Sequence, residues 1–389
     1  MPWKETQKMD QRIEFALKAL RSPNFRDLCR EYGISTKTGY KWRDRLLQEG
    51  MAGMSEQSRR PHGHANELGE VVVCEIVRLK QGHPHWGARK IQALYGRKHG
   101  TGVPSESSFK RILERAGLTE RRPKKRCMQS AGRLSSGIKA EQPNEVWTVD
   151  FKGWWKDRQG LRVEPLTVRD EYSRMVLEIK VMEDSRGQSV RRCFERLFQR
   201  YGLPGAIRSD NGSPFASVNA VLGLSRLSAW WLALGIDLER SRVACPQDNG
   251  AHERLHRDIR RELQSAGVGW DQSAFDLWRQ EFNTERPHES LAMRVPADLY
   301  RHSQRAYEGT PDDIDYGNMD SRKVNAKNGT ITYGADRLFV STALGGWSVG
   351  VSVRQDGLVE VWFSKLLLGH IDPQTSSFKP SQQALPQNQ

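Results

Sequence analysis

The sequence predicts a multidomain protein with three kinds of architecture along one chain. Helical periodicity dominates the first part, and short apolar strands alternate with amphipathic helices in the middle. Short strands separated by Asn-Gly, Gly-Gly and Asp-Gly turns fill the end. We therefore expect N-terminal all-α helix-turn-helix units, a central α/β mixed sheet and a C-terminal small β-barrel. A chain of 389 residues is long enough for two or three domains with cores of their own.

Residues 1–58 are predicted to form a helix-turn-helix DNA-binding domain. Gly33 can end one helix and Ser35 can cap the next. The second helix is basic and aromatic, which suits a helix that enters the major groove of DNA. An ordinary helical hairpin with a solvated basic face is the alternative. The DNA-binding residues that we expect here are Lys37, Lys41 and Arg43.

Residues 67–120 are predicted to form a second helical DNA-binding domain. Its three helices are expected at 70–80, within 82–100 and at 103–118, the third beginning near Ser105. A basic linker, 121–140, follows without any acidic side chain and could track a phosphate backbone. The DNA-binding residues that we expect in this domain are Arg89, Lys90, Lys110 and Arg111.

Residues 141–305 show the alternation of strands and helices that is typical of an α/β core. Three successive strands, NEVWTVDFKGWW, LRVEPLTVRDEYSR and MVLEIKVM, precede a helix at 185–202. The strand GAIRSD, a helix at 225–235, the strand IDLERS and a helix beginning near Asn249 follow. This order suits a mixed sheet with helices on its faces. The small barrel is expected at 316–372, and the Gln-, Ser- and Pro-rich tail at 373–389 is expected to be disordered.

Three acidic residues stand at positions that a fold could bring together. Asp150 closes the first strand, Asp210 follows the strand AIRS, and Glu253 lies in the first turn of a helix. Carboxylates are the ligands that Mg²⁺ prefers, and two ions about 3.5–4 Å apart can activate a water and stabilise a leaving oxygen of a phosphodiester. We predict a site for two Mg²⁺ or Mn²⁺ ions. Taken singly, these residues could be a strand-edge acid, a turn former and a helix ion-pair partner.

The helix from about 249 to 264 has two distinct faces. Helical spacing places Glu253, Arg257, Arg260 and Gln264 on one face, and Leu255, Ile259 and Leu263 nearly opposite. Because arginine pairs with phosphate through two hydrogen bonds, we expect Arg257 and Arg260 to bind the DNA backbone. The competing carboxylates are Asp170, Asp237 and Asp248, with Glu262 as the substitute for Glu253.

The composition indicates a polyanionic partner. The chain has 61 Lys and Arg against 47 Asp and Glu, a formal net charge of +14. An inert basic surface, or RNA or membrane-surface binding, are the alternatives. No apolar run approaches the roughly 18 residues that span a bilayer, and no GxxxxGK[ST] phosphate loop is present, so we expect neither membrane nor nucleotide cofactor. The scattered cysteines contain no CxxC pair and favour a reduced cytoplasmic protein without structural zinc.

Several ordered motifs resemble those of the integrase-core insertion-sequence transposases, members of the DDE superfamily that includes retroviral integrases. They are VWTVDF, DEYSR, GLPGAIRSDNGSPF, CPQDNGAHERLHRDIRREL and FNTERPHESLAMRVPADLY, and the resemblance covers about residues 20–305. It implies an RNase H-like central fold and maps the catalytic and metal-binding triad to Asp150, Asp210 and Glu253. The interval from Asp210 to Glu253 is longer than in many relatives, which we interpret as a subgroup insertion.

The resemblance further implies a bacterial, cytoplasmic, nucleoid-associated DNA transposase. Such an enzyme binds terminal inverted repeats, hydrolyses a phosphodiester and transfers the 3′-hydroxyl into target DNA, as a homodimer or higher synaptic complex. His288 is expected to support the fold, and His252 and His256 to contact DNA or the sheet instead of a metal. Two alternatives stay open: a catalytically silent, domesticated DNA-binding regulator, and an RNase H-like nuclease.

Overall fold

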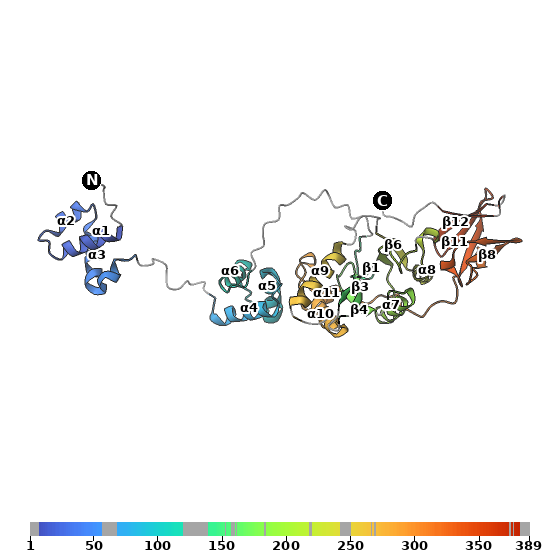
Figure 1. The fold of residues 1–389 in the computed structure, drawn as a ribbon, viewed down its shortest axis with the longest axis horizontal. Helices are drawn as coiled ribbons and strands as arrows, with labels where there is room; N and C mark the ends of the chain where they lie inside the picture. Colours follow the sequence, from blue (N-terminus) through green and yellow to red (C-terminus); the bar gives the residue numbers. More distant parts are fainter. Residues whose placement is uncertain are drawn as a thin grey trace. The chain divides into compact units, whose positions relative to one another are not determined.

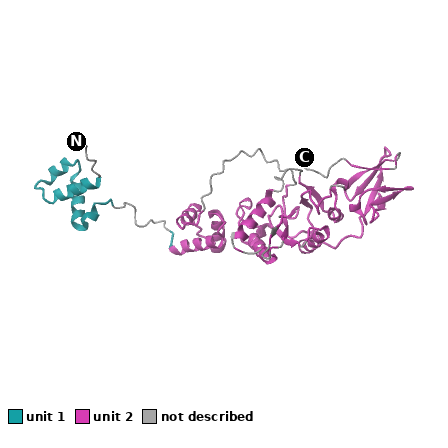
Figure 2. Ribbon diagram, viewed as in Figure 1, with its two compact units in different colours: residues 1–69 teal, residues 70–389 magenta. Residues whose placement is uncertain are grey.

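The contacts of the chain divide it into two units, Met1–Gly69 and Glu70–Gln389 (Figure 2). No helix in the described part of the chain has the length and apolarity needed to cross a bilayer. The domain boundaries given above stay predictions. The computed structural model describes residues 8–56, 68–119 and 139–381, with gaps at 152, 157–159, 161, 183, 218–219, 242–249, 266, 268–269, 373–374 and 376.

The first unit is a small helical domain built around a capped turn. Gly33 adopts a φ of 62°, which only glycine adopts at little cost, and ends the second helix. Ser35 then caps the third helix by accepting a hydrogen bond from the Thr38 amide at 3.2 Å. The predicted turn and cap are confirmed. The elements are α1 (Lys8–Ala19), α2 (Phe25–Glu31), α3 (Thr36–Glu49) and the 3₁₀ turn η1 (Gly50–Met54).

Three more helices open the second unit: α4 (Glu70–Gly82), α5 (Ala88–His99) and α6 (Glu106–Arg115). They enclose a core of their own that includes Trp86 and Phe109. Ser105 caps α6 through the Ser108 amide at 3.3 Å, as its position after Pro104 predicts.

The central sheet is mixed, as predicted, with strand order β2-β3-β1-β5-β6 and with β4 paired to β3 (Figure 1). The β1–β3 and β3–β4 pairs are antiparallel, whereas β5 runs parallel to both β1 and β6. The strands are β1 (Val146–Phe151), β2 (Trp155–Lys156), β3 (Arg162–Asp170), β4 (Val176–Met182), β5 (Ala206–Ser209) and β6 (Asp237–Arg240).

Helices cover the sheet on both faces. Aromatic residues of α7 (Gly187–Tyr201) and α8 (Arg226–Ala233) pack against Trp147 and Val149 of β1. Residues of α9 (Gly250–Ser265) and α10 (Gln272–Thr284) pack on β4 from the other side. Since neighbouring residues of a strand point to opposite faces, Thr148 and Asp150 belong to the face under α9. The short helix α11 (Pro296–Leu299) follows.

The C-terminal region differs from the expected barrel. Among its described residues, five strands form an open antiparallel sheet in the order β13-β12-β11-β10-β7, and β8 and β9 pair with each other. No hydrogen-bonded ring closes, because the β8–β9 hairpin meets β7 and β13 through packing contacts alone. The strands are β7 (Asp320–Lys323), β8 (Thr330–Tyr333), β9 (Asp336–Phe339), β10 (Ser348–Val353), β11 (Val359–Phe363), β12 (Leu366–Asp372) and β13 (Ser377–Pro380).

The tail is also more ordered than its composition predicts. Strand β13 lies inside the segment expected to be disordered and pairs with β12 from Gly369 opposite Pro380 to Asp372 opposite Ser377. Close approach requires a glycine here, since a Cβ on Gly369 would collide with the Lys379 carbonyl oxygen. Composition alone missed this strand because pairing with a neighbour supplies its order. Residues 382–389 lie outside the described part.

Asn283 gives a test of how α10 is fastened to the sheet. Its buried amide accepts a hydrogen bond from the Val176 amide at 2.9 Å and donates to the Val176 carbonyl at 2.8 Å. Asn283→Ala leaves both backbone groups without this partner, so we predict a loss of about 2–4 kcal/mol in the free energy of unfolding. Urea denaturation followed by tryptophan fluorescence measures it. The control is Gln280→Ala on the exposed side of the same helix, and an equal loss in both variants would contradict the assignment.

Candidate active site

Two of the predicted acidic residues stand at the ends of neighbouring parallel strands. Thr148 of β1 lies opposite Arg208 of β5, so Asp150 and Asp210 each follow two positions later, at the carboxyl end of their strands. Residues in register on parallel strands point to the same face. Both carboxylates are half-buried. The sheet thus directs them to one edge and one face, where sites of α/β proteins gather.

Asp210 also has the turn-forming role that its Asn-Gly neighbours indicate. Its carboxylate accepts a hydrogen bond from the Gly212 amide at 3.1 Å. Its backbone carbonyl accepts one from Arg240 at 3.2 Å, and burial lowers the pKa of Arg240 to about 10. These contacts hold the strand end in place.

Helix α9 presents the two faces that its sequence predicts. Leu255, Ile259 and Leu263 are buried against the sheet and α10. The opposite side is exposed, so a carboxylate and basic side chains share a surface that a ligand can reach. The exposed residues are Glu253, Arg257, Arg260 and Gln264.

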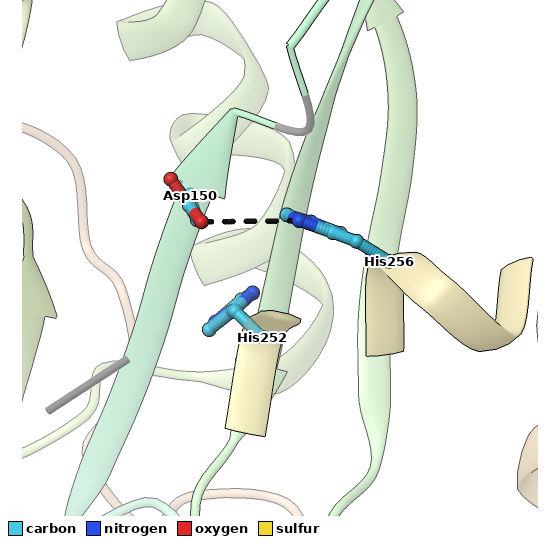
Figure 3. Close-up of side chains that lie close together, drawn as sticks. All are labelled: Asp150, His252 and His256. Carbon is cyan, nitrogen blue, oxygen red and sulfur yellow. Dashed lines mark ion pairs between the residues drawn. The ribbon is translucent and has the colours of Figure 1, made fainter. Parts of the chain in front are cut away.

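The first turn of α9 is held on the sheet by two buried histidines. His252 lies 2.7 Å from the Thr148 hydroxyl and 3.2 Å from the Thr167 hydroxyl. His256 lies 2.8 Å from the same Thr167 hydroxyl and 3.9 Å from the Asp150 carboxylate, measured from its Nε2 and Nδ1 atoms respectively (Figure 3). The expectation that these histidines contact the sheet is confirmed. Their contacts are polar, because β1 and β3 present threonines here in place of apolar side chains.

His252 is a neutral structural residue in this arrangement. It is fully buried, and burial, reinforced by the nearby Arg169, lowers its pKa well below the ordinary value. Both ring nitrogens are within hydrogen-bonding distance of threonine hydroxyls. The histidine therefore fixes the position of the helix turn that carries Glu253.

The structure brings together a different set of metal-type ligands from the one predicted. Within the described residues, ligand atoms of Asp150, His252 and His256 lie within 4.8 Å of one another. Asp210 and Glu253 are not part of this cluster. The sequence analysis considered both histidines but did not expect them to bind a metal, although their four-residue spacing on a helix places two rings on one face.

The competing carboxylates have structural partners or lie elsewhere. Asp170 is fully buried and accepts hydrogen bonds from the Asn144 amide at 2.7 Å and the Ser173 hydroxyl at 2.6 Å, and burial raises its pKa. Glu262 accepts from Trp278 and Arg286, both at 2.8 Å. Asp237 is exposed at the start of β6, at the other end of that strand from the site. Asp248 lies outside the described residues.

A basic cleft of about 1410 Å³ lies next to the site within the second unit. Within the same unit, His83 lies 2.9 Å from Glu281 of α10, and Arg97 of α5 pairs with Asp298 of α11 at 2.6 Å. Basic side chains outnumber acidic ones along its lining. Four of the predicted DNA-binding residues line it: Arg89, Lys90, Lys110 and Arg257.

The remaining predicted DNA-binding residues differ in their surroundings. Lys37, Lys41, Arg111 and Arg260 are exposed. Arg43 instead donates to Asp44 at 2.8 Å and lies 4.7 Å from the Tyr40 ring.

Two residues of the cleft also have protein partners. Lys110 pairs with Glu106 at 2.6 Å. Lys90 is half-buried, and burial followed by the charge of Arg286 lowers its pKa to about 8. An anion in the cleft must therefore compete with Glu106 for Lys110. Lys90 has already lost part of its hydration through burial.

Comparisons with known protein families agree with this architecture. An integrase core domain family matches residues 140–246, and a second integrase core domain family matches residues 234–296. A helix-turn-helix domain family matches residues 11–62, and a homeodomain-like domain family matches residues 38–113.

The relatives include insertion-element proteins. The chain is 28% identical over 255 residues to an uncharacterized 31.7 kDa protein of insertion element IS407 from Burkholderia multivorans, covering 64% of this chain and 87% of that protein. It is 26% identical over 270 residues to an uncharacterized 39.2 kDa protein of insertion element IS476 from Xanthomonas euvesicatoria, covering 67% and 74%. The transposase for insertion sequence element IS904 from Lactococcus lactis is 25% identical over 173 residues, covering 43% and 65%.

Among solved structures, the catalytic core domain of BIV integrase matches with a TM-score of 0.32 and 23% identity, covering 40% of this chain and 93% of that one. The integrase core matches and the insertion-element relatives together show that the chain is similar to insertion-element proteins and contains an integrase-like core.

Proposed function

We propose that this protein is a DNA transposase that holds two divalent cations at Asp150, Asp210 and Glu253 and uses them to cut and join DNA. The observation that supports the proposal is the register of β1 and β5, by which Asp150, near the end of β1, and Asp210, directly after β5, stand at corresponding positions. His256, three residues after Glu253, reaches to 3.9 Å from Asp150. The first turn of α9 is therefore next to the strand ends.

The proposed donor set suits Mg²⁺ or Mn²⁺, since carboxylate oxygens are their usual protein ligands. When bound, such ions make a water or 3′-hydroxyl more acidic and stabilise the leaving oxygen. Around them, Arg257 and Arg260 present exposed guanidiniums on the Glu253 side of α9 and can hold DNA phosphates by paired hydrogen bonds.

The reaction we propose has two steps that share one site. In the first, a water oxygen bonds to phosphorus at the transposon end, and the bond to the 3′ oxygen breaks to give a 3′-hydroxyl and a 5′-phosphate. In the second, that 3′-hydroxyl bonds to a phosphorus of target DNA and displaces another 3′ oxygen. One phosphodiester is exchanged for another in the second step, so no nucleotide cofactor is consumed.

We further propose that the helical domains recognise terminal inverted repeats, with Lys37 and Lys41 on the exposed side of α3 among the contacts. Both transposon ends need processing together, which requires a homodimer or a higher synaptic complex. The expected location is the bacterial cytoplasm, in association with the nucleoid.

The first test removes the proposed metal carboxylates one at a time. In a strand-transfer assay with terminal-repeat DNA and Mg²⁺, Asp150→Asn, Asp210→Asn and Glu253→Gln should each lower the rate by at least about 100-fold, because each loses a charged metal ligand. Binding of the same DNA should stay within about threefold. Asp237→Asn, an exposed aspartate at the far end of β6, is the matched control and should retain the wild-type rate.

The outcomes also separate the alternatives. Full activity in Asp150→Asn or Asp210→Asn would defeat the proposed mechanism. DNA binding without any cleavage by the wild-type chain would favour a silent regulator, and cleavage of RNA–DNA hybrids in preference to transposon ends would favour a nuclease.

A second test concerns the arginines of α9. Arg257→Ala and Arg260→Ala should each weaken DNA binding and reduce the slope of log Kd against log salt by about 1, as expected for one lost phosphate contact. Arg322→Ala in β7, whose guanidinium already pairs with Asp320, serves as the control. Fluorescence anisotropy across a salt series makes the measurement, and an unchanged slope in both α9 variants would show that these arginines do not touch phosphate.

A further inference from the structure

His256 lies where a ligand of the proposed metal site would lie. Its ring is buried, and its Nδ1 atom is 3.9 Å from an Asp150 carboxylate oxygen. The two side chains come from different elements, α9 and β1, and converge from opposite sides (Figure 3). Their closeness is therefore a result of the tertiary fold and not of proximity in the sequence.

The hydrogen bonds of Thr167 define which atom of His256 faces Asp150. The Thr167 hydroxyl lies 3.0 Å from the Asp150 backbone carbonyl, which can only accept, so the hydroxyl donates its single hydrogen there. Toward His256 Nε2, at 2.8 Å, the same oxygen must then accept. Nε2 therefore carries the hydrogen, and Nδ1 is the ring nitrogen that lies 3.9 Å from the Asp150 carboxylate.

A carboxylate oxygen and an imidazole nitrogen can both bind a metal ion, and these two atoms belong to one cluster of possible ligand atoms. Ligand atoms about 2.0–2.2 Å from one ion can be separated by up to about 4.4 Å, so the observed 3.9 Å is within reach of a shared ion. The hydrogen bond from Nε2 to Thr167 supplies the second-sphere contact that commonly orients a histidine ligand. His252 lacks this capacity, because threonine hydroxyls lie against both of its nitrogens.

We propose that His256 Nδ1 is a nitrogen ligand of the cation held by Asp150, which gives this site a preference for Mn²⁺ over Mg²⁺. The inference rests on the proposed function for Asp150 and adds a ligand to it. The preference follows because Mg²⁺ binds oxygen almost exclusively, whereas imidazole is a good ligand for transition-metal ions.

The direct test is pulsed electron paramagnetic resonance of Mn²⁺ bound to the full chain. Wild-type protein should show the ¹⁴N coupling of a directly bound imidazole. The coupling should vanish in His256→Asn and persist in His302→Asn, which alters an exposed histidine outside the site. Titrations should show a roughly tenfold loss of Mn²⁺ affinity in His256→Asn, with Mg²⁺ affinity changed less than about threefold.

The outcomes distinguish this inference from the function on which it rests. Absence of ¹⁴N coupling in the wild type, or its persistence in His256→Asn, overturns the role of His256. If either of these results is found and Asp150→Asn nevertheless loses Mn²⁺ binding, the proposed metal site is supported but His256 is not one of its ligands. Unchanged Mn²⁺ binding in Asp150→Asn overturns both. If His256→Asn does not fold, the presence or absence of ¹⁴N coupling in the wild-type spectrum decides whether a histidine binds the ion.

Discussion

The docking of the first turn of α9 on a polar patch of the sheet is the constraint on which the candidate site depends. Thr148 and Thr167 offer hydroxyls on this face, and His252 and His256 lie within hydrogen-bonding distance of them. Farther along the helix, Ile259 and other apolar residues complete the packing. Apolar packing is non-directional, whereas these hydrogen bonds fix the rotation of the helix at the end where Glu253 lies.

The buried and the exposed side chains of α9 have different roles. The face of α9 toward the sheet holds hydrogen-bonded groups, and burial lowers the pKa of His252. Glu253 and the exposed arginines lie beside this face. Phosphates can therefore approach the arginines without disturbing the buried contacts that position the helix, and the basic cleft of the second unit extends the positive surface beyond the helix.

The sequence predicts elements well where the signal is local. The cap at Ser35, the strand ending at Asp150 and the two faces of α9 follow from turn chemistry and periodicity, and the structure has them. What depends on distant pairing was harder to foresee. Within the described C-terminal residues the strands form an open sheet, because β8 and β9 pair only with each other there, and β13 gains its order from β12. The approach of His256 to Asp150 likewise depends on how a helix meets a strand remote in sequence.

Anomalous diffraction from crystals of the full chain grown with Mn²⁺ tests the central claim most directly. The account predicts manganese peaks at the carboxyl ends of β1 and β5, contacting Asp150 and Asp210 beneath the first turn of α9. Manganese bound elsewhere, with these carboxylates turned to other partners, would contradict it.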